Sequence, residues 1–122
     1  GVILIGSSKS PAEFGAVLRL LAPLADLAPV AFLQQLAGKA PSELMQMFKD
    51  SDPAFIRAMC RAILRWEGIT DPALRLHRIH GRHDLVIPSP DEADYLLNGG
   101  HLIAMTHAEE CVARVREILS RA

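Results

Sequence analysis

An aspartate and a histidine each follow an apolar segment in the second half of the chain. Asp84 comes shortly after Gly81, and His101 directly follows Gly99 and Gly100. A carboxylate that binds one ring nitrogen of a histidine fixes the tautomer of the imidazole and stabilises its charged form. The other ring nitrogen can then remove a proton from a nucleophilic hydroxyl group. The residue types and their order therefore predict that Asp84 and His101 are the acid and base of a Ser-His-Asp type of site.

Two strands are needed to bring these side chains together. The apolar residues that lead to Ile79 predict a strand that stops at Gly81, and residues 93–97 predict a second, short strand. Loops at the carboxyl ends of neighbouring parallel strands meet at one edge of a sheet, so we expect Asp84 and His101 to lie within hydrogen-bond distance. The two glycines before His101 are expected to let the backbone turn tightly.

The first residues of the chain predict a third strand. Residues 2–5, VILI, form a continuous aliphatic run, which is typical of a strand buried on both faces of a parallel sheet. A chain that opens on Gly1 with such a strand is expected to lack an upstream part of its domain. We predict one α/β domain with a strand and loop over residues 1–10, a helical lid or crossover over 11–72, and a strand–strand–helix unit over 73–122.

Three segments carry the signature of a helix start. Ser10 and Asp52 are each followed by a proline, which fits the first position of a helix behind a capping side chain. Thr106 and Glu109 have the spacing of a capping box that would open the last helix. Apolar side chains of the insertion are expected to pack in the core, with an acyl-binding pocket as the alternative. These side chains are Met45, Met47, Phe48, Phe55, Met59 and Trp66.

The composition limits the classes of function. The 122 residues are 50% hydrophobic and 22% charged, which predicts one soluble globular domain. The formal net charge of −1 lacks the basic excess of a nucleic-acid binder. No apolar run is long enough for a membrane span or a signal peptide, so we expect a cytoplasmic protein without membrane partners. Cys60 and Cys111 are expected to be buried thiols, with a disulfide as the alternative.

Residues 79–88, IHGRHDLVIP, resemble the acid loop of the α/β-hydrolase superfamily, written hydrophobic-H-G-x-x-D-x-h-h-P, where h is hydrophobic. Residues 99–102, GGHL, resemble its catalytic-histidine loop, and residues 106–119 are similar to its last helix. The opening VILIGSS is similar to the strand that precedes the lid in this family. The resemblance covers the whole chain as the C-terminal half of the fold. It implies about three parallel strands, a multi-helix lid and a C-terminal helix, with Asp84 as the triad acid and His101 as the base.

The chain departs from the family pattern in two ways. The Gly-x-Ser-x-Gly elbow and the oxyanion-hole loop of the family lie upstream of the opening strand, so the resemblance places the nucleophile outside these 122 residues. In addition, His101 follows Asp84 by only 17 positions, where family members often have a full helix. We expect that helix to be shortened to a turn.

Ser8 is the alternative nucleophile within the chain. It follows a predicted strand in the string GSSKS, and it precedes Asp84 and His101 in the order that the family uses. An elbow passes directly from its serine into a helix, however, whereas Pro11 delays the helix here and Ser10 replaces the final glycine. The interpretation that we favour is a polar loop at the end of a strand.

A metal site is the other alternative. His80, His83, Asp84 and His101 include ligand types that bind zinc. The H-x-x-H spacing falls on a transition from strand to loop, where it does not form a helical ligand pair, and no cysteine lies nearby. We therefore predict neither a metal nor another cofactor.

Two functions remain open at this point. The first is serine-type hydrolysis of a small ester, amide or similar acyl substrate by the complete protein, with this chain alone inactive. The second is a non-catalytic, truncated hydrolase-like module. In either case an exposed edge of the first strand would need a partner, so we expect a homo-oligomer through that strand.

Overall fold

The computed structural model describes residues 1–16, 43, 46–47 and 50–121. Its centre is a parallel sheet of three strands, β1 (Val2–Ile5), β2 (Leu76–Gly81) and β3 (Tyr95–Leu97), in that spatial order. The register pairs Ile5 with Ile79 and Gly81 with Leu97, so the carboxyl ends of the strands lie along one edge. This arrangement confirms the predicted α/β class and places the loops after β2 and β3 next to each other.

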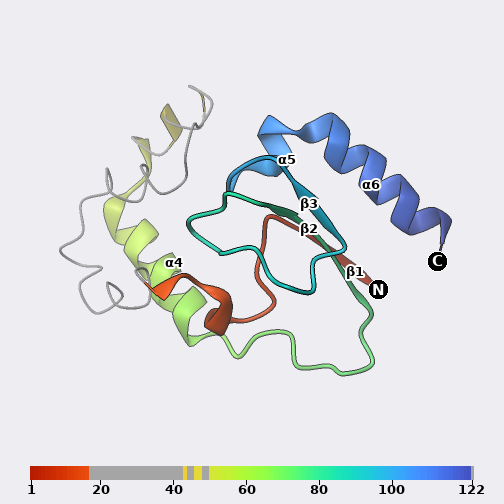
Figure 1. The fold of residues 1–122 in the computed structure, drawn as a ribbon. Helices are drawn as coiled ribbons and strands as arrows, with labels where there is room; N and C mark the ends of the chain where they lie inside the picture. Colours follow the sequence, from red (N-terminus) through yellow and green to blue (C-terminus); the bar gives the residue numbers. More distant parts are fainter. Residues whose placement is uncertain (17–42, 44–45, 48–49, 122) are drawn as a thin grey trace.

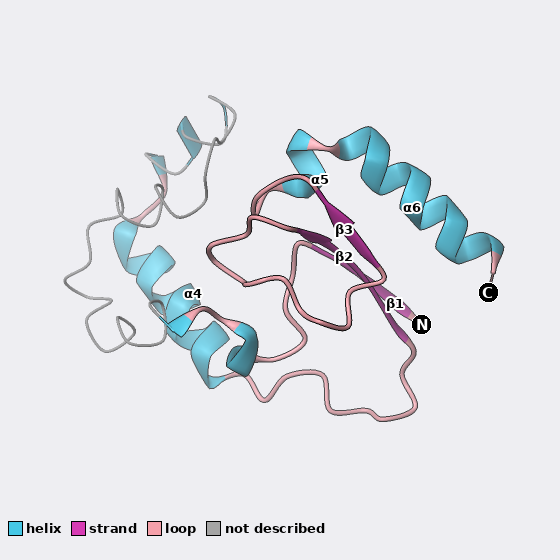
Figure 2. Cartoon of the chain, in the orientation of Figure 1, coloured by secondary structure: helices cyan, strands magenta, loops and turns pink. Residues whose placement is uncertain are grey.

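The helices lie on both sides of this sheet (Figure 1). On one face, α6 (Ala108–Ser120) and the short α5 (Ile103–Thr106) cover the strands. The 3-10 turn η1 (Pro11–Glu13) and α4 (Pro53–Arg65) lie beyond the other face, with long loops between them and the strands (Figure 2). The core lies between the sheet and α6. Its buried side chains are Ile79, Leu97, Ile103, Cys111 and Ile118.

The predicted helix start is confirmed at α4, and the predictions for the other two helix starts are wrong. Asp52 caps α4, because its side chain accepts a hydrogen bond from the backbone N–H of Ala54 at 2.8 Å. At Pro11 the chain makes the 3-10 turn η1, without a side-chain cap, in place of the predicted helix start. The predicted capping box is wrong, because Thr106 already ends α5 and its hydroxyl donates to the carbonyl of Leu102 at 3.1 Å. The helical region therefore begins at Ile103 with α5, and the last helix, α6, begins at Ala108.

Two burial predictions also need correction. The strand β1 is half-buried rather than buried on both faces, because it is an edge strand of the described sheet and pairs only with β2. On α4, Phe55 is 60% and Met59 is 45% exposed, so these side chains are not in the core. Met47 and Trp66 are exposed as well. Met45, Phe48 and the side chain of Cys60 lie outside the described residues, whereas Cys111 is a buried free thiol. Within the described residues, no helix has the length and apolarity that a membrane span requires.

The glycines near the histidine loop serve close packing rather than an unusual backbone turn. Neither Gly99 nor Gly100 has a positive φ. A Cβ atom on Gly99 would lie 2.7 Å from the ring of His107. A Cβ atom on Gly81 would lie 2.6 Å from the carbonyl oxygen of Gly99 and closer still to that of Gly100. The loop that carries His101 therefore lies directly against the backbone of Gly81.

Replacing Gly81 with alanine should lower the free energy of unfolding by about 3 kcal/mol, because a backbone segment rather than a flexible side chain must move. Urea denaturation measures this change. Gly100→Ala is the matched control, since among the described residues its Cβ would meet only the carbonyl oxygen of His83, at 3.8 Å. Equal stability of the two variants would contradict the close approach at Gly81.

Candidate active site

The structure brings Asp84 and His101 into direct contact. Asp84 lies in the loop after β2, and His101 lies in the loop between β3 and α5. The Nδ1 atom of His101 is 2.9 Å from Oδ2 of Asp84. The link between the two residues contains no helix, and Pro90–Ala93 forms a turn in which the amide of Ala93 donates to Pro90. This short connection leaves the two loops within reach of each other.

The carboxylate of Asp84 is fully enclosed. Its side chain has no exposed surface, and Oδ1 accepts hydrogen bonds from the backbone N–H groups of Val86 at 2.8 Å and Ile87 at 2.9 Å. Burial by itself would raise the pKa of Asp84, but the hydrogen bonds from His101, His80 and Ile87 outweigh it and hold that pKa far below its usual range. Asp84 is therefore ionised at neutral pH and acts only as an acceptor.

This ionised acceptor determines the tautomer of His101. Because Asp84 cannot donate, Nδ1 of His101 must carry the proton of their hydrogen bond. The Nε2 atom is then left with its lone pair when the ring is neutral. The side chain of His101 is 25% exposed, and Nε2 makes no hydrogen bond to another described residue. A ring held on one side and open on the other can act as a general base.

Ser8 is near the carboxyl end of β1, but it does not complete a triad among the described residues. It is 6% exposed and forms no hydrogen bond with His101 there. The chain after it makes the 3-10 turn η1 rather than the helix that a nucleophile elbow requires. Its neighbour Ser7 uses its carbonyl oxygen to accept a hydrogen bond from Arg78 at 3.3 Å.

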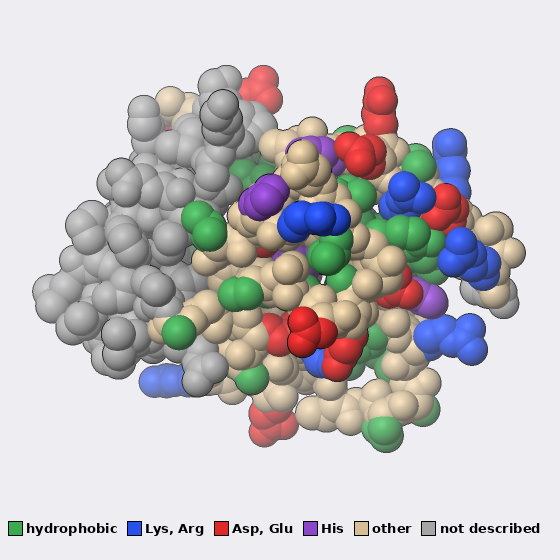
Figure 3. Space-filling view, viewed as in Figure 1, with side chains coloured by type: hydrophobic (Ala, Val, Ile, Leu, Met, Phe, Trp, Pro, Cys, Tyr) green, Lys and Arg blue, Asp and Glu red, His purple; other side chains and the backbone are tan. Residues whose placement is uncertain are grey.

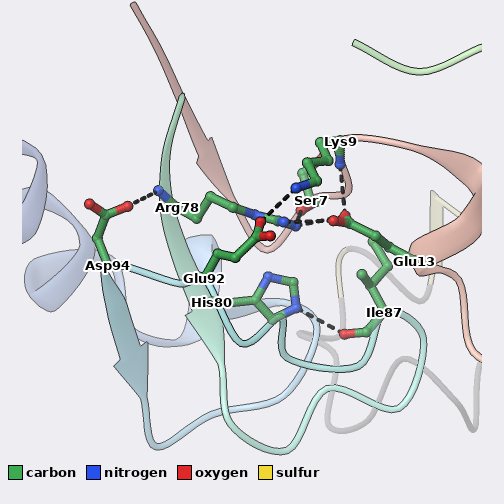
Figure 4. Close-up of polar contacts among 8 residues, drawn as sticks. All are labelled: Ser7, Lys9, Glu13, Arg78, His80, Ile87, Glu92 and Asp94. Atoms are coloured by element: carbon green, nitrogen blue, oxygen red, sulfur yellow. Dashed lines mark hydrogen bonds and ion pairs between the residues drawn. The ribbon is translucent and has the colours of Figure 1, made fainter. Parts of the chain in front are cut away.

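A buried ion pair that the sequence interpretation missed holds this loop (Figure 4). The guanidinium of Arg78, which is 3% exposed, binds both carboxylate oxygens of Glu13, at 2.6 and 2.7 Å. Burial opposes ionisation of Glu13, but the bonds from Arg78 and from the amide of Lys9 outweigh it and lower its pKa. The available signal was a charged residue next to Ile79 in the middle of a predicted strand. The pair ties η1 to the central strand β2.

Glu13→Gln should lower the free energy of unfolding by about 2 kcal/mol at neutral pH, because it leaves the charge of Arg78 buried without a counter-ion. Thermal or urea denaturation measures the change. The matched control is Glu92→Gln, which breaks the exposed ion pair with Lys9 and should change stability by less than about 0.5 kcal/mol. A loss in the control as large as that in Glu13→Gln would show that burial of the pair is not the cause.

The other described histidines bind protein groups and do not converge on a common metal site. The Nε2 atom of His83 lies 3.0 Å from Oδ1 of Asn98, and the Nδ1 atom of His77 lies 3.2 Å from Oδ1 of Asp94. His80 is 1% exposed, and its Nε2 atom lies 3.2 Å from Oδ2 of Asp84. Over the ranges that the structure describes, no group of three or more His, Cys, Asp or Glu side chains is arranged to hold a metal ion.

The surface carries charges of both signs. On the face drawn in Figure 3, basic and acidic side chains are intermingled, with hydrophobic side chains exposed between them. That face shows no extended area of a single charge.

Comparison of the chain with known protein families, curated proteins and solved structures finds no match.

Proposed function

We propose that this chain carries the acid and the base of a serine-type hydrolase of the α/β-hydrolase kind. The observation that supports the proposal is the contact between the buried, ionised Asp84 and the partly exposed His101. The sequence of the two loops, IHGRHDLVIP and GGHL, supports it independently, because both resemble the corresponding loops of that superfamily. The proposed substrate is a small ester, amide or similar acyl compound.

In the proposed reaction, the hydroxyl nucleophile comes from a segment outside these 122 residues. The Nε2 atom of His101 removes the proton of that hydroxyl as it attacks the acyl carbon, and then transfers this proton to the leaving group. The same nitrogen next deprotonates a water molecule as its oxygen attacks the acyl carbon. The bond between that carbon and the nucleophile oxygen then breaks, His101 returns the proton to the nucleophile oxygen, and the acid is released. Asp84 keeps Nδ1 protonated and stabilises the imidazolium that forms in each step.

The remaining parts of the proposal concern the surroundings of the site. Residues 11–72 would form its lid, of which residues 17–42, 44–45 and 48–49 lie outside the described part. The exposed Phe55 and Met59 of α4 would then face the apolar part of the substrate. The buried free thiol of Cys111 supports a reducing, cytoplasmic location.

A fluorophosphonate probe, which reacts with activated serines, tests the proposal on the complete product of the gene that encodes this chain. We expect labelling of one serine in a Gly-x-Ser-x-Gly sequence, and no turnover of a p-nitrophenyl ester by the 122 residues alone. A folded gene product that stays unlabelled and inactive on esters would refute the hydrolase. Turnover by the 122 residues that Ser8→Ala abolishes would instead assign Ser8 as the nucleophile.

We propose a self-associating, non-catalytic module as the second candidate. The observation that favours it is an apolar hollow of about 350 Å³ beside the edge strand β1, lined by Ile5, Cys111, Val112 and Val115 among others. An edge strand next to apolar surface can pair with a second copy. Light scattering should then show a dimer that Val112→Arg dissociates, and a clean monomer for the unmodified chain would refute this candidate.

A further inference from the structure

A second histidine, which is buried, contacts the carboxylate of Asp84. His80 is on β2, and its ring is almost completely buried, with 1% of its side chain exposed. Its Nε2 atom lies 2.9 Å from the carbonyl oxygen of Ile87 and 3.2 Å from Oδ2 of Asp84 (the first contact is drawn in Figure 4). Both neighbours are acceptors, so Nε2 of His80 must carry a proton.

The peptide of Ile87 is therefore held at both ends. Its N–H donates to Oδ1 of Asp84, and its carbonyl accepts from His80. The second oxygen of Asp84 lies between two imidazoles, with Nδ1 of His101 at 2.9 Å and Nε2 of His80 at 3.2 Å. His80 thus contacts the carboxylate directly and also supports the loop that holds it.

We propose that His80 is a positioning residue for the base: its Nε2–H, bound between Ile87 and Asp84, holds the carboxylate in the orientation that binds His101. The catalytic meaning of this role rests on the proposed function. The contacts of His80 do not rest on the proposed function, because they are made within the described residues.

The charged groups around His80 are consistent with this role. Asp84 faces it from the loop after β2, Arg78 precedes it on the same face of β2, and Glu13 of η1 neutralises Arg78. His101 reaches the same carboxylate oxygen from the loop after β3. Burial disfavours a charged His80, but the hydrogen bonds to Asp84 and Ile87 outweigh it and raise the pKa of His80. His80 thus has a proton on Nε2 in either charge state.

The test is the Nδ1–H proton of His101, observed by NMR in the 122-residue chain. In His80→Phe, which keeps the ring volume and removes the donor, this proton should exchange with water about tenfold faster, the order of effect for one ordinary hydrogen bond. Its resonance should also move upfield, because the bond to Asp84 weakens. His80→Gln is the matched control, since its amide can donate at the position of Nε2 and should restore slow exchange.

Unchanged exchange in a folded His80→Phe variant would overturn the proposal. Equal acceleration in His80→Phe and His80→Gln would also overturn it, because the effect would then come from packing. If the phenylalanine variant does not fold, His80→Asn provides the same comparison with a side chain too short to reach Ile87. Because this measurement needs no turnover, its failure is separate from failure of the fluorophosphonate labelling that tests the hydrolase.

Discussion

Replacing Asp84 with alanine is expected to lower the free energy of unfolding by about 4 kcal/mol, the range found when one partner of a buried charge network is removed. The substitution leaves the N–H groups of Val86 and Ile87 and the Nδ1–H of His101 without their acceptor. It also removes the contact of Asp84 with His80, whose Nε2–H keeps only the carbonyl oxygen of Ile87. Buried donors without partners are a large penalty, because water satisfies them in the unfolded chain. Urea denaturation at neutral pH measures the change.

Two further variants separate the causes of this loss. Asp84→Asn keeps an oxygen for the two amides but removes the charge, so it should lose about half as much stability as the alanine variant. Asp91→Ala is the control, because Asp91 is an exposed residue of the turn before β3 and its removal should change stability by less than about 0.5 kcal/mol. A loss below about 1 kcal/mol in Asp84→Ala would contradict the hydrogen-bond network around this carboxylate.

The same carboxylate makes stability depend on pH in the acidic range. The pKa of Asp84 in the folded chain is far below its ordinary value of 3.8, so the unfolded chain takes up its proton first as pH falls. The contribution of Asp84 is therefore complete above the ordinary value and is lost progressively below it. Between pH 5 and pH 2, the free energy of unfolding should therefore fall less steeply with decreasing pH for Asp84→Asn than for the unmodified chain. Urea denaturation at each pH measures this dependence.

Removing the proposed base is expected to have the largest effect on the proposed activity. In the complete gene product, His101→Gln should lower kcat by about 10⁴-fold, because the proposed reaction has no other group to remove the proton of the nucleophile. KM for a p-nitrophenyl ester should change little, since the imidazole acts mainly in the transition state. Steady-state kinetics at saturating ester measure both constants.

His83→Gln is the control for this experiment. His83 lies in the same group of loops, but it is exposed and binds Asn98 rather than Asp84. Its substitution should leave kcat within about threefold of the unmodified protein, the range expected for a surface change outside the reacting groups. If both variants lost activity equally, the histidines would act through the shape of the loop, and the assignment of His101 as base would fail.

Much of the site could be predicted because its positions depend on local sequence. Glycine and proline mark where the chain leaves the strands, so the loops of Asp84 and His101 could be placed at the ends of β2 and β3. Parallel pairing then requires these loops to be neighbours. The cap of α4 could be predicted for the same reason, since Asp52 and Pro53 act within one turn.

The partners of the buried polar groups could not be predicted in this way. Arg78 and Glu13 are 65 positions apart, and no local pattern pairs them. His80 could be expected to form a hydrogen bond, but its two acceptors are known only once the loop of residues 84–87 is packed against β2.

The sequence by itself determined the α/β class, the two loops, and that Asp84 and His101 would meet at one edge of the sheet, because periodicity, turn residues and chain order are local properties. Only the tertiary structure decided that β1 is an edge strand, that Gly81 and Gly99 are needed for packing, and that His80 supports Asp84. Each of these depends on distances between segments far apart in the chain. Packing the histidine loop against β2 sets those distances, and the order of residues along the chain does not reveal them.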